Sequence, residues 1–353
     1  MRLPVISAVA LTAVALVAAA CNRPEGGAGQ ERGVDVAGMD LKVAPGDDFF
    51  AYANGGWDKV TPIPPDRSTF GLFATLAEAT TQRTADLIKS VAGDRPAAGT
   101  EARKIADYFD SFSDEAAIDA AGLTAIKPKL DEIAAINDRA GLSRFVGESL
   151  RADVDPMNAT NFRTDNLFGL WVSPGFADAG TNSAYLLQGG VAMPDREYYL
   201  AQDAKMAGFQ QAYQKHIAQV LTLAGLPDAQ AKAAQVYALE RKIAEAHAPR
   251  AESEDVHKAN NPWPTAEFST RAPGLDWPTW FKATGLDTQK TFVVWQVGAV
   301  RGISALAASE PLEDWKNYLA FHAIEHVSGT LPKAFADENF VFYGTALQGT
   351  PKQ

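Results

Sequence analysis

Reactive and metal-binding side chains are scarce in this sequence. Its 353 residues include one cysteine, Cys21, and five histidines. A single cysteine excludes an intramolecular disulfide bond. The formal net charge is −11, and no stripe of lysine and arginine is present, which argues against a nucleic-acid partner. After the first twenty residues, no segment is long and apolar enough to predict a membrane-spanning helix.

Several catalytic and nucleotide-binding signatures are also missing. The sequence has no nucleophile elbow, P-loop, dinucleotide-binding fingerprint or H-E-x-x-H motif. A Ser-His-Asp triad stays open, because the members of a triad can lie far apart in a sequence. These motifs therefore identify no catalytic residue.

The N-terminus has the pattern of an export signal. Arg2 precedes an apolar run at residues 3–17, and alanines stand directly before Cys21. The run is too short to span a bilayer, so we interpret residues 1–20 as a signal peptide. A cysteine at the cleavage point resembles the lipidated cysteine of bacterial lipoproteins; the alternative is an ordinary signal peptide with an incidental cysteine. We expect an exported protein, lipid-anchored to a bacterial membrane and facing the periplasm or the exterior. Residues 21–44 would then form a glycine-rich, flexible tether.

From residue 45 onward, the apolar residues mostly follow helical spacing. This predicts a mainly α fold, a multi-helix lobe over residues 45–353. Apolar runs at residues 167–172 and 184–187 flank a turn-rich stretch, which predicts a small two-stranded β ribbon. Residues 291–297 fit either a strand or the start of a buried helix.

Two helix starts can be placed from their capping residues. Asp47 is suited to cap a short helix that Gly55 ends. Ser309 is suited to cap a later helix with Pro311 in its first turn. The apolar stripe of that later helix runs through Trp315.

The stretch FHAIEHVSG at residues 321–329 is the strongest chemical candidate. It places His322, Glu325 and His326 in an H-x-x-E-H pattern, the inverted zinc-peptidase signature. At about 100° per residue, both histidines fall on one helical face, so they could converge on a metal. The same face carries the apolar stripe, so both could equally be buried packing residues. No third ligand can be placed with confidence after Gly329.

Five stretches together resemble the N-terminal half of the neprilysin-like zinc metallopeptidases. They are PGDDFFAYANGGW (45–57), IPPDRSTFGLF (63–73), GGVAMPDREYYL (189–200), PLEDWKNYLAFH (311–322) and FVFYGTALQGTPKQ (340–353). The resemblance implies a helical lobe that closes over a separate catalytic lobe. In that family the zinc, held by H-E-x-x-H, belongs to the later half of the protein. We therefore expect no metal, cofactor or catalytic residue in this chain, which would be inactive alone. The chain would be a truncated gene product, a fragment or one half of a split protein. Its expected partners are the missing catalytic lobe and peptide substrates.

The resemblance implies one substrate-binding residue. Two alternative functions of the chain also stay open. Phe73 matches a family position that faces a side-chain pocket beside the zinc, although packing on its own helix is the simpler role. Thr69 and Ala77 stand where some animal members have arginines for a substrate carboxylate, so that clamp is in doubt. One alternative is a self-contained zinc hydrolase using His322, Glu325 and His326. The other is a peptide-binding surface lipoprotein without catalysis.

Overall fold

The computed structural model describes residues 35–159 and 162–351. Two compact units follow each other along the chain, one ending at Ile63 and one beginning at Pro64. Cys21 and the expected signal peptide lie outside the described residues. Across the described ranges, no helix combines the length and apolar character needed to cross a membrane.

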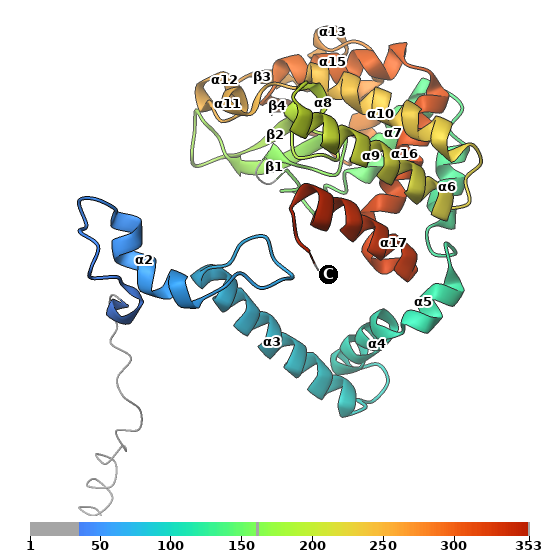
Figure 1. Cartoon of the computed structure of the whole chain (residues 1–353). Coiled ribbons are helices and arrows are strands. Elements are labelled where there is room, and N and C mark those ends of the chain that lie inside the picture. The colour runs from blue at the N-terminus through green and yellow to red at the C-terminus, as the bar shows by residue number, and fades with distance from the viewer. Residues whose placement is uncertain (1–34, 160–161, 352–353) are drawn as a thin grey trace, which may run out of the picture. The chain divides into compact units, whose positions relative to one another are not determined.

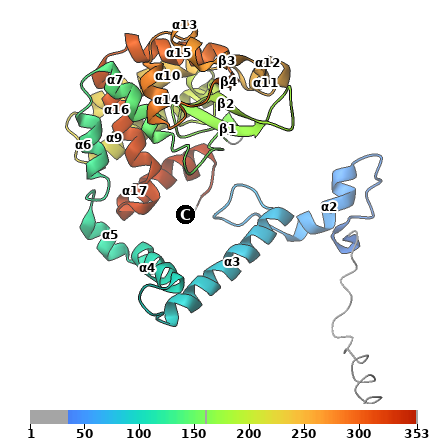
Figure 2. The same cartoon turned by 180° about the vertical axis from the view of Figure 1, so that it is seen from behind.

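The fold is mainly α, as the sequence predicts, with a small sheet of four strands (Figures 1 and 2). The elements in chain order are η1 (Val36–Gly38), α2 (Phe49–Val60), α3 (Leu72–Gly93), α4 (Glu101–Ser113), α5 (Glu115–Ala121), α6 (Lys127–Ala134), α7 (Arg139–Ser149), β1 (Phe168–Pro174), β2 (Asn182–Gln188), α8 (Glu197–Leu200), α9 (Ala204–Leu223), α10 (Ala229–Ala246), α11 (Arg250–Ser253), α12 (Val256–Ala259), β3 (Pro262–Pro264), η3 (Thr265–Glu267), α13 (Phe268–Arg271), α14 (Trp277–Ala283), β4 (Thr291–Val294), α15 (Val297–Ser309), α16 (Leu312–His326), η4 (Ser328–Thr330), α17 (Lys333–Asn339) and η5 (Phe340–Leu347).

The first unit packs a short turn against α2. Asp48, not Asp47, caps this helix by accepting a hydrogen bond from the Ala51 N–H at 2.9 Å. The helix does not end at Gly55 but runs on to Val60. Gly55 is buried, and a Cβ on it would lie 3.0 Å from the Cβ of Asp40. The glycine therefore permits close packing rather than ending the helix. Asp40 also pairs with Lys59, so the end of the expected tether is held against α2.

The predicted ribbon is present but belongs to a larger sheet. Strands β1 and β2 pair antiparallel from Phe168 with Gln188 to Pro174 with Asn182. Strand β4 pairs parallel to β2 and antiparallel to β3, giving the order β1-β2-β4-β3. Residues 291–297 therefore divide between a strand and the first residue of α15. The three-residue β3 has two prolines, so no local pattern in the sequence predicts it.

The second unit has two main groups of buried apolar side chains. One lies among α7, α14, α15 and the sheet, and includes Trp277, Trp280 and Phe292. The other lies among α9, α10, α16 and the C-terminal helices, and includes Tyr213 and Phe342. Helices α9, α10 and α16 pack against one another and lie side by side in both views (Figures 1 and 2). The polar residues described next lie at this junction.

Helix α16 does not begin where its expected cap predicts. Ser309 is the last residue of α15, and Pro311 occupies the N-cap position of α16. Proline has no backbone N–H and a fixed φ, so the chain breaks between the two helices at this point. The apolar stripe is correctly placed, because Trp315 and Tyr318 are buried.

Candidate functional site

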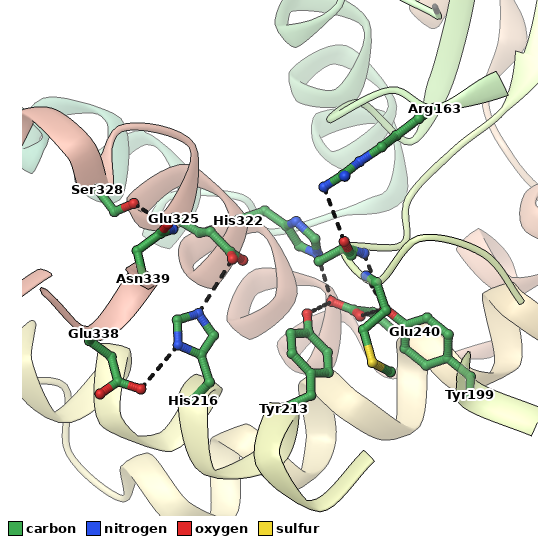
Figure 3. A network of polar contacts seen from close by, with 12 residues as sticks. Arg163, Tyr199, Tyr213, His216, Glu240, His322, Glu325, Ser328, Glu338 and Asn339 are labelled. Carbon is green, nitrogen blue, oxygen red and sulfur yellow. Dashed lines mark hydrogen bonds and ion pairs between the residues drawn. The ribbon is translucent and has the colours of Figure 1, made fainter. Parts of the chain in front are cut away.

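The H-x-x-E-H residues lie in the last turns of α16, but their side chains engage different partners. His322 faces Glu240 of α10, and Glu325 faces His216 of α9 (Figure 3). His326 faces Asp165. His322 and Glu325 are largely buried, whereas His326 is exposed. The helical face predicted from the sequence is correct for His322, and the exposure of His326 shows that the stripe does not extend to the helix end.

Glu240 is the centre of a buried polar cluster. Its side chain is 0% exposed and sits in the apolar face of α10. The hydroxyl of Tyr199 donates to its Oε2 at 2.6 Å, and the hydroxyl of Tyr213 donates to its Oε1 at 2.9 Å. His322 Nε2 lies 2.8 Å from the same Oε1. Three polar partners thus compensate a carboxylate that would be costly to bury alone.

The same cluster fixes the loop before α8. The Tyr199 hydroxyl accepts hydrogen bonds from the backbone N–H groups of Ala192 and Met193, at 3.1 and 3.0 Å. Tyr199 thereby connects this loop to Glu240, and through Glu240 to α9 and α16. Burial, and to a lesser extent the charge of Glu240, raises the pKa of Tyr199 well above its ordinary value, so the hydroxyl of Tyr199 keeps its proton.

Neighbouring carboxylates favour the charged form of the His322 imidazole. Burial alone would lower its pKa, but the hydrogen bond to Glu240 and the charges of Glu240, Glu325 and Asp165 raise it above the ordinary value. A protonated imidazole has a hydrogen on both nitrogens and no lone pair for a metal. His322 is therefore an ion-pair partner of Glu240.

His216 is a second buried imidazole between two carboxylates. It is 0% exposed, with Nδ1 3.1 Å from Glu338 Oε1 and Nε2 3.4 Å from Glu325 Oε1. Burial would lower its pKa, yet the two carboxylates outweigh burial and raise it to about 9. Its ring stacks on Phe342, with centroids 5.0 Å apart. The charged ring joins α9, α16 and α17.

The exposed end of the motif forms a separate pair. His326 Nδ1 lies 3.3 Å from Asp165 Oδ2, and both side chains are about two-thirds exposed. The hydrogen bond to Asp165 raises the pKa of His326, and the same bond lowers the pKa of Asp165. This pair lies at the rim of a cavity of about 260 Å³ that is also lined by Arg163, His322 and Tyr343, among others.

These residues do not fit a zinc ion. The nitrogens and oxygens that would bind it are directed at Glu240, His216 and Asp165 rather than at one point. Within residues 35–159 and 162–351, no group of three or more His, Cys, Asp or Glu side chains is placed to hold a metal ion. A catalytic zinc needs three protein ligands and an open position for water. The alternative of a self-contained zinc hydrolase therefore gains no support from the geometry.

The predicted substrate-binding residue lies away from this cluster. Phe73 is in the first turn of α3 and is 89% exposed. It does not pack on its own helix as the simpler interpretation expected. Thr69 and Ala77 are exposed as well. The contact of Phe73 with a substrate stays a prediction.

Sequence reasoning did not identify Glu240, Tyr199, Tyr213, His216 or Glu338 as members of this cluster. One signal for Glu240 was available. It lies four positions after Val236 and three before Ile243, so it shares the apolar face of its helix with these residues. A carboxylate on such a face requires a partner. The partners come from distant segments, so spacing in the sequence could not identify them.

The sequence of this chain is similar to those of a known protein family. The family model of peptidase family M13 matches residues 45–353. Endothelin-converting enzyme 1 of Homo sapiens is 26% identical over 331 residues, which cover 90% of this chain and 42% of that protein. The rat enzyme (Rattus norvegicus) is 25% identical over 325 residues, with 89% and 42% covered.

Solved structures agree with the family model. The zinc metalloprotease Zmp1 of Mycobacterium tuberculosis, in complex with an inhibitor, superposes with a TM-score of 0.80 at 30% identity, covering 90% of this chain and 48% of that one. PepO of Lactobacillus rhamnosis HN001 has a TM-score of 0.66 at 17% identity, which shows the shared fold alone. The chain spans less than half the length of these relatives. It belongs to peptidase family M13, a family of zinc metallopeptidases.

Proposed function

We propose that this chain is the non-catalytic, access-restricting lobe of a zinc metalloendopeptidase that acts on peptides. The peptide-cleaving half would come from sequence outside these 353 residues, in the same chain or in a separate one. Support comes from the family match over residues 45–353 and from the relatives, of which this chain covers 42% and 48%. The cluster around Glu240 would then have a structural role in the lobe.

One observation carries the proposal, namely the exposure of the side chains of helix α3. This helix has 22 residues and no buried side chain. Leu72, Phe73, Leu76 and Leu87 are among the exposed large apolar side chains. Helix α3 packs against α4, yet these side chains stay exposed. Most of the stability of a protein helix comes from packing of an apolar face, so they indicate a further partner. A second lobe with an apolar surface would cover these side chains.

The proposal predicts that the chain alone self-associates. Apolar patches exposed on a monomer promote association. We expect the purified chain to form oligomers in light scattering and to bind the dye ANS. The double variant Phe73→Ser, Leu76→Ser should reduce both signals, whereas Val256→Ser, an exposed apolar position on α12, should not. A stable monomer that binds no dye contradicts the proposal.

Phe73 is the proposed contact to substrate in the assembled enzyme. Its side chain is free of packing on α3 and is available to another lobe or to a bound peptide. In a protein that carries both lobes, Phe73→Ala should raise KM for peptides, whereas Leu87→Ala on the same helix should not. Equal kinetics for both variants would contradict the assignment.

We also propose that Cys21 carries a lipid that anchors the exported protein. The basis is the sequence alone, with an apolar run directly before a single cysteine. Mass spectrometry of the membrane fraction should find a diacylglyceryl-modified N-terminus at Cys21. A Cys21→Ser variant should then be released from the membrane, and retention of that variant would contradict the anchor.

A further inference from the structure

A small cavity of about 40 Å³ shares Arg163, Thr164 and Val191 with the cavity near His326. It is formed by the segment around Arg163, the end of β2, the loop before α8 and the segment that follows α10. Arg163, Arg196 and Arg250 line it, together with Asp195, Gln188 and His247 among others. Figure 3 shows the Arg163 side chain extending toward the loop before α8. Three distant parts of the sequence thus each bring one guanidinium group to this cavity.

The lining has an excess of positive charge. Three arginines and one acidic residue, Asp195, line the cavity. Arg196 and Arg250 also form ion pairs with Glu197 and Glu254, which lie outside the lining. Asp195 Oδ1 already accepts a hydrogen bond from the backbone N–H of Glu197 at 2.8 Å. Within the described ranges, neither this carboxylate nor any other forms an ion pair with Arg163. In a chain with a formal net charge of −11, three arginines around one cavity are a marked local departure.

The guanidinium groups also retain free donors. Each guanidinium has five N–H bonds. Across the described residues, Arg163 donates to the Ala192 carbonyl at 3.3 Å, and Arg250 donates to Glu254 at 2.8 Å. Arg196 donates to the Ala244 carbonyl at 3.3 Å and to Glu197 at 2.8 Å. Most donors of all three groups therefore remain available to a ligand.

His247 forms a neutral part of the wall. Its Nε2 lies 2.8 Å from the Gly189 carbonyl oxygen, to which it donates. Burial, only partly offset by that bond, lowers its pKa to about 4, and the nearby charge of Arg196 adds to the lowering. Gln188 is fixed by two hydrogen bonds to the backbone of Ala248. Hydrogen bonds to the backbone therefore fix His247 and Gln188 in the cavity wall. The arginines supply the positive charge of the lining.

We propose that this cavity binds a small oxyanion, a carboxylate or phosphate group, between the guanidinium groups of Arg163, Arg196 and Arg250. Planar guanidinium groups match both oxyanions through paired N–H donors. The volume is enough for a few water molecules, so it admits the charged group of a ligand and not a large side chain.

Calorimetric titration of the full chain tests the site, with inorganic phosphate and acetate as the probes at constant ionic strength. Constant ionic strength keeps non-specific screening equal between titrations. We expect saturable binding that weakens about tenfold or more in Arg163→Gln and in Arg250→Gln, because each loses a charge-assisted contact. Arg196 is left unchanged because its Nε also holds the backbone of α10.

Arg144→Gln is the matched control, since it removes the same charge from an exposed position on α7 outside the cavity. It should bind both probes as the unmodified chain does. Tighter binding of phosphate indicates a phosphorylated ligand, and tighter binding of acetate indicates a carboxylate ligand. Absence of saturable binding, or equal weakening in all three variants, overturns the proposal. Unchanged thermal unfolding of the two cavity variants shows that they fold.

Discussion

At the scale of single residues, Glu240 connects more of the second unit than any sequence motif suggested. A fully buried carboxylate is tolerated here because Tyr199, Tyr213 and His322 all direct hydrogen-bond donors at it. Removal of one partner from a buried ion pair is strongly destabilising, because the other charge is left uncompensated.

We therefore expect Glu240→Gln to lower the free energy of unfolding by about 3 kcal/mol. The amide retains the shape of the side chain but leaves His322 without the carboxylate that it faces. Urea denaturation measures the effect. Glu245→Gln on the same helix removes an exposed carboxylate paired with Arg241 and should change stability by about 0.5 kcal/mol or less. Equal effects of the two substitutions would contradict the role of Glu240.

The residues of the site show what sequence reasoning can reach. The face of α16 that holds His322 follows from helical periodicity, and so does the burial of His247 at the end of α10. Periodicity does not decide whether His322 binds a metal or pairs with a carboxylate. That depends on Glu240, which lies 82 positions away in the sequence. Glu338 is likewise 122 positions from His216.

At the scale of elements, the charged His216 fastens α17 to the rest of the second unit. Glu338 of α17 and Glu325 of α16 approach it from two sides, and Phe342 of η5 stacks on its ring. Asn339 adds a hydrogen bond to Ser328 at 2.9 Å. The buried charge thus adds to the apolar packing of Phe335 and Phe342 in holding this segment.

This arrangement gives docking of α17 a defined dependence on pH. The pKa of His216 is about 9 in the folded protein, above its ordinary value of 6.5, so protonation stabilises the folded state. The contribution, about 3 kcal/mol, is fully present below pH 6.5 and is lost as the pH rises through 9. We expect the stability difference between the unmodified chain and His216→Gln to shrink over that range in urea denaturation. A difference that stays constant from pH 6 to 10 would exclude the charged imidazole as its cause.

The elements also differ in how far the sequence predicts them. Helices with a continuous apolar stripe, such as α9, are evident from spacing alone. Strand β3 is not, because Pro262–Pro264 becomes a strand only through pairing with β4. The predicted end of α2 is wrong for a related reason, because Gly55, in the middle of the helix, permits packing against Asp40 and does not end the helix. Tertiary contacts override local preference at each of these points.

At the scale of the whole molecule, the chain combines a well-packed body with two helices, α3 and α4, that pack against each other and still expose large apolar side chains. Two groups of buried side chains stabilise the second unit beyond residue 123. By contrast, Ile105, Tyr108 and Phe112 of α4 are exposed, as are the apolar residues of α3. Family M13 membership and this unpaired surface support the same interpretation, a lobe that acts with a second lobe.

The most direct test is a joint measurement of bound zinc and peptide cleavage on the purified chain after incubation with zinc. We expect no stoichiometric zinc and no cleavage that a chelator abolishes. The control is His326→Ala, an exposed position whose substitution leaves the buried cluster intact. One tightly bound zinc, with chelator-sensitive cleavage that His326→Ala eliminates, would show that this chain is an enzyme by itself and would contradict the account.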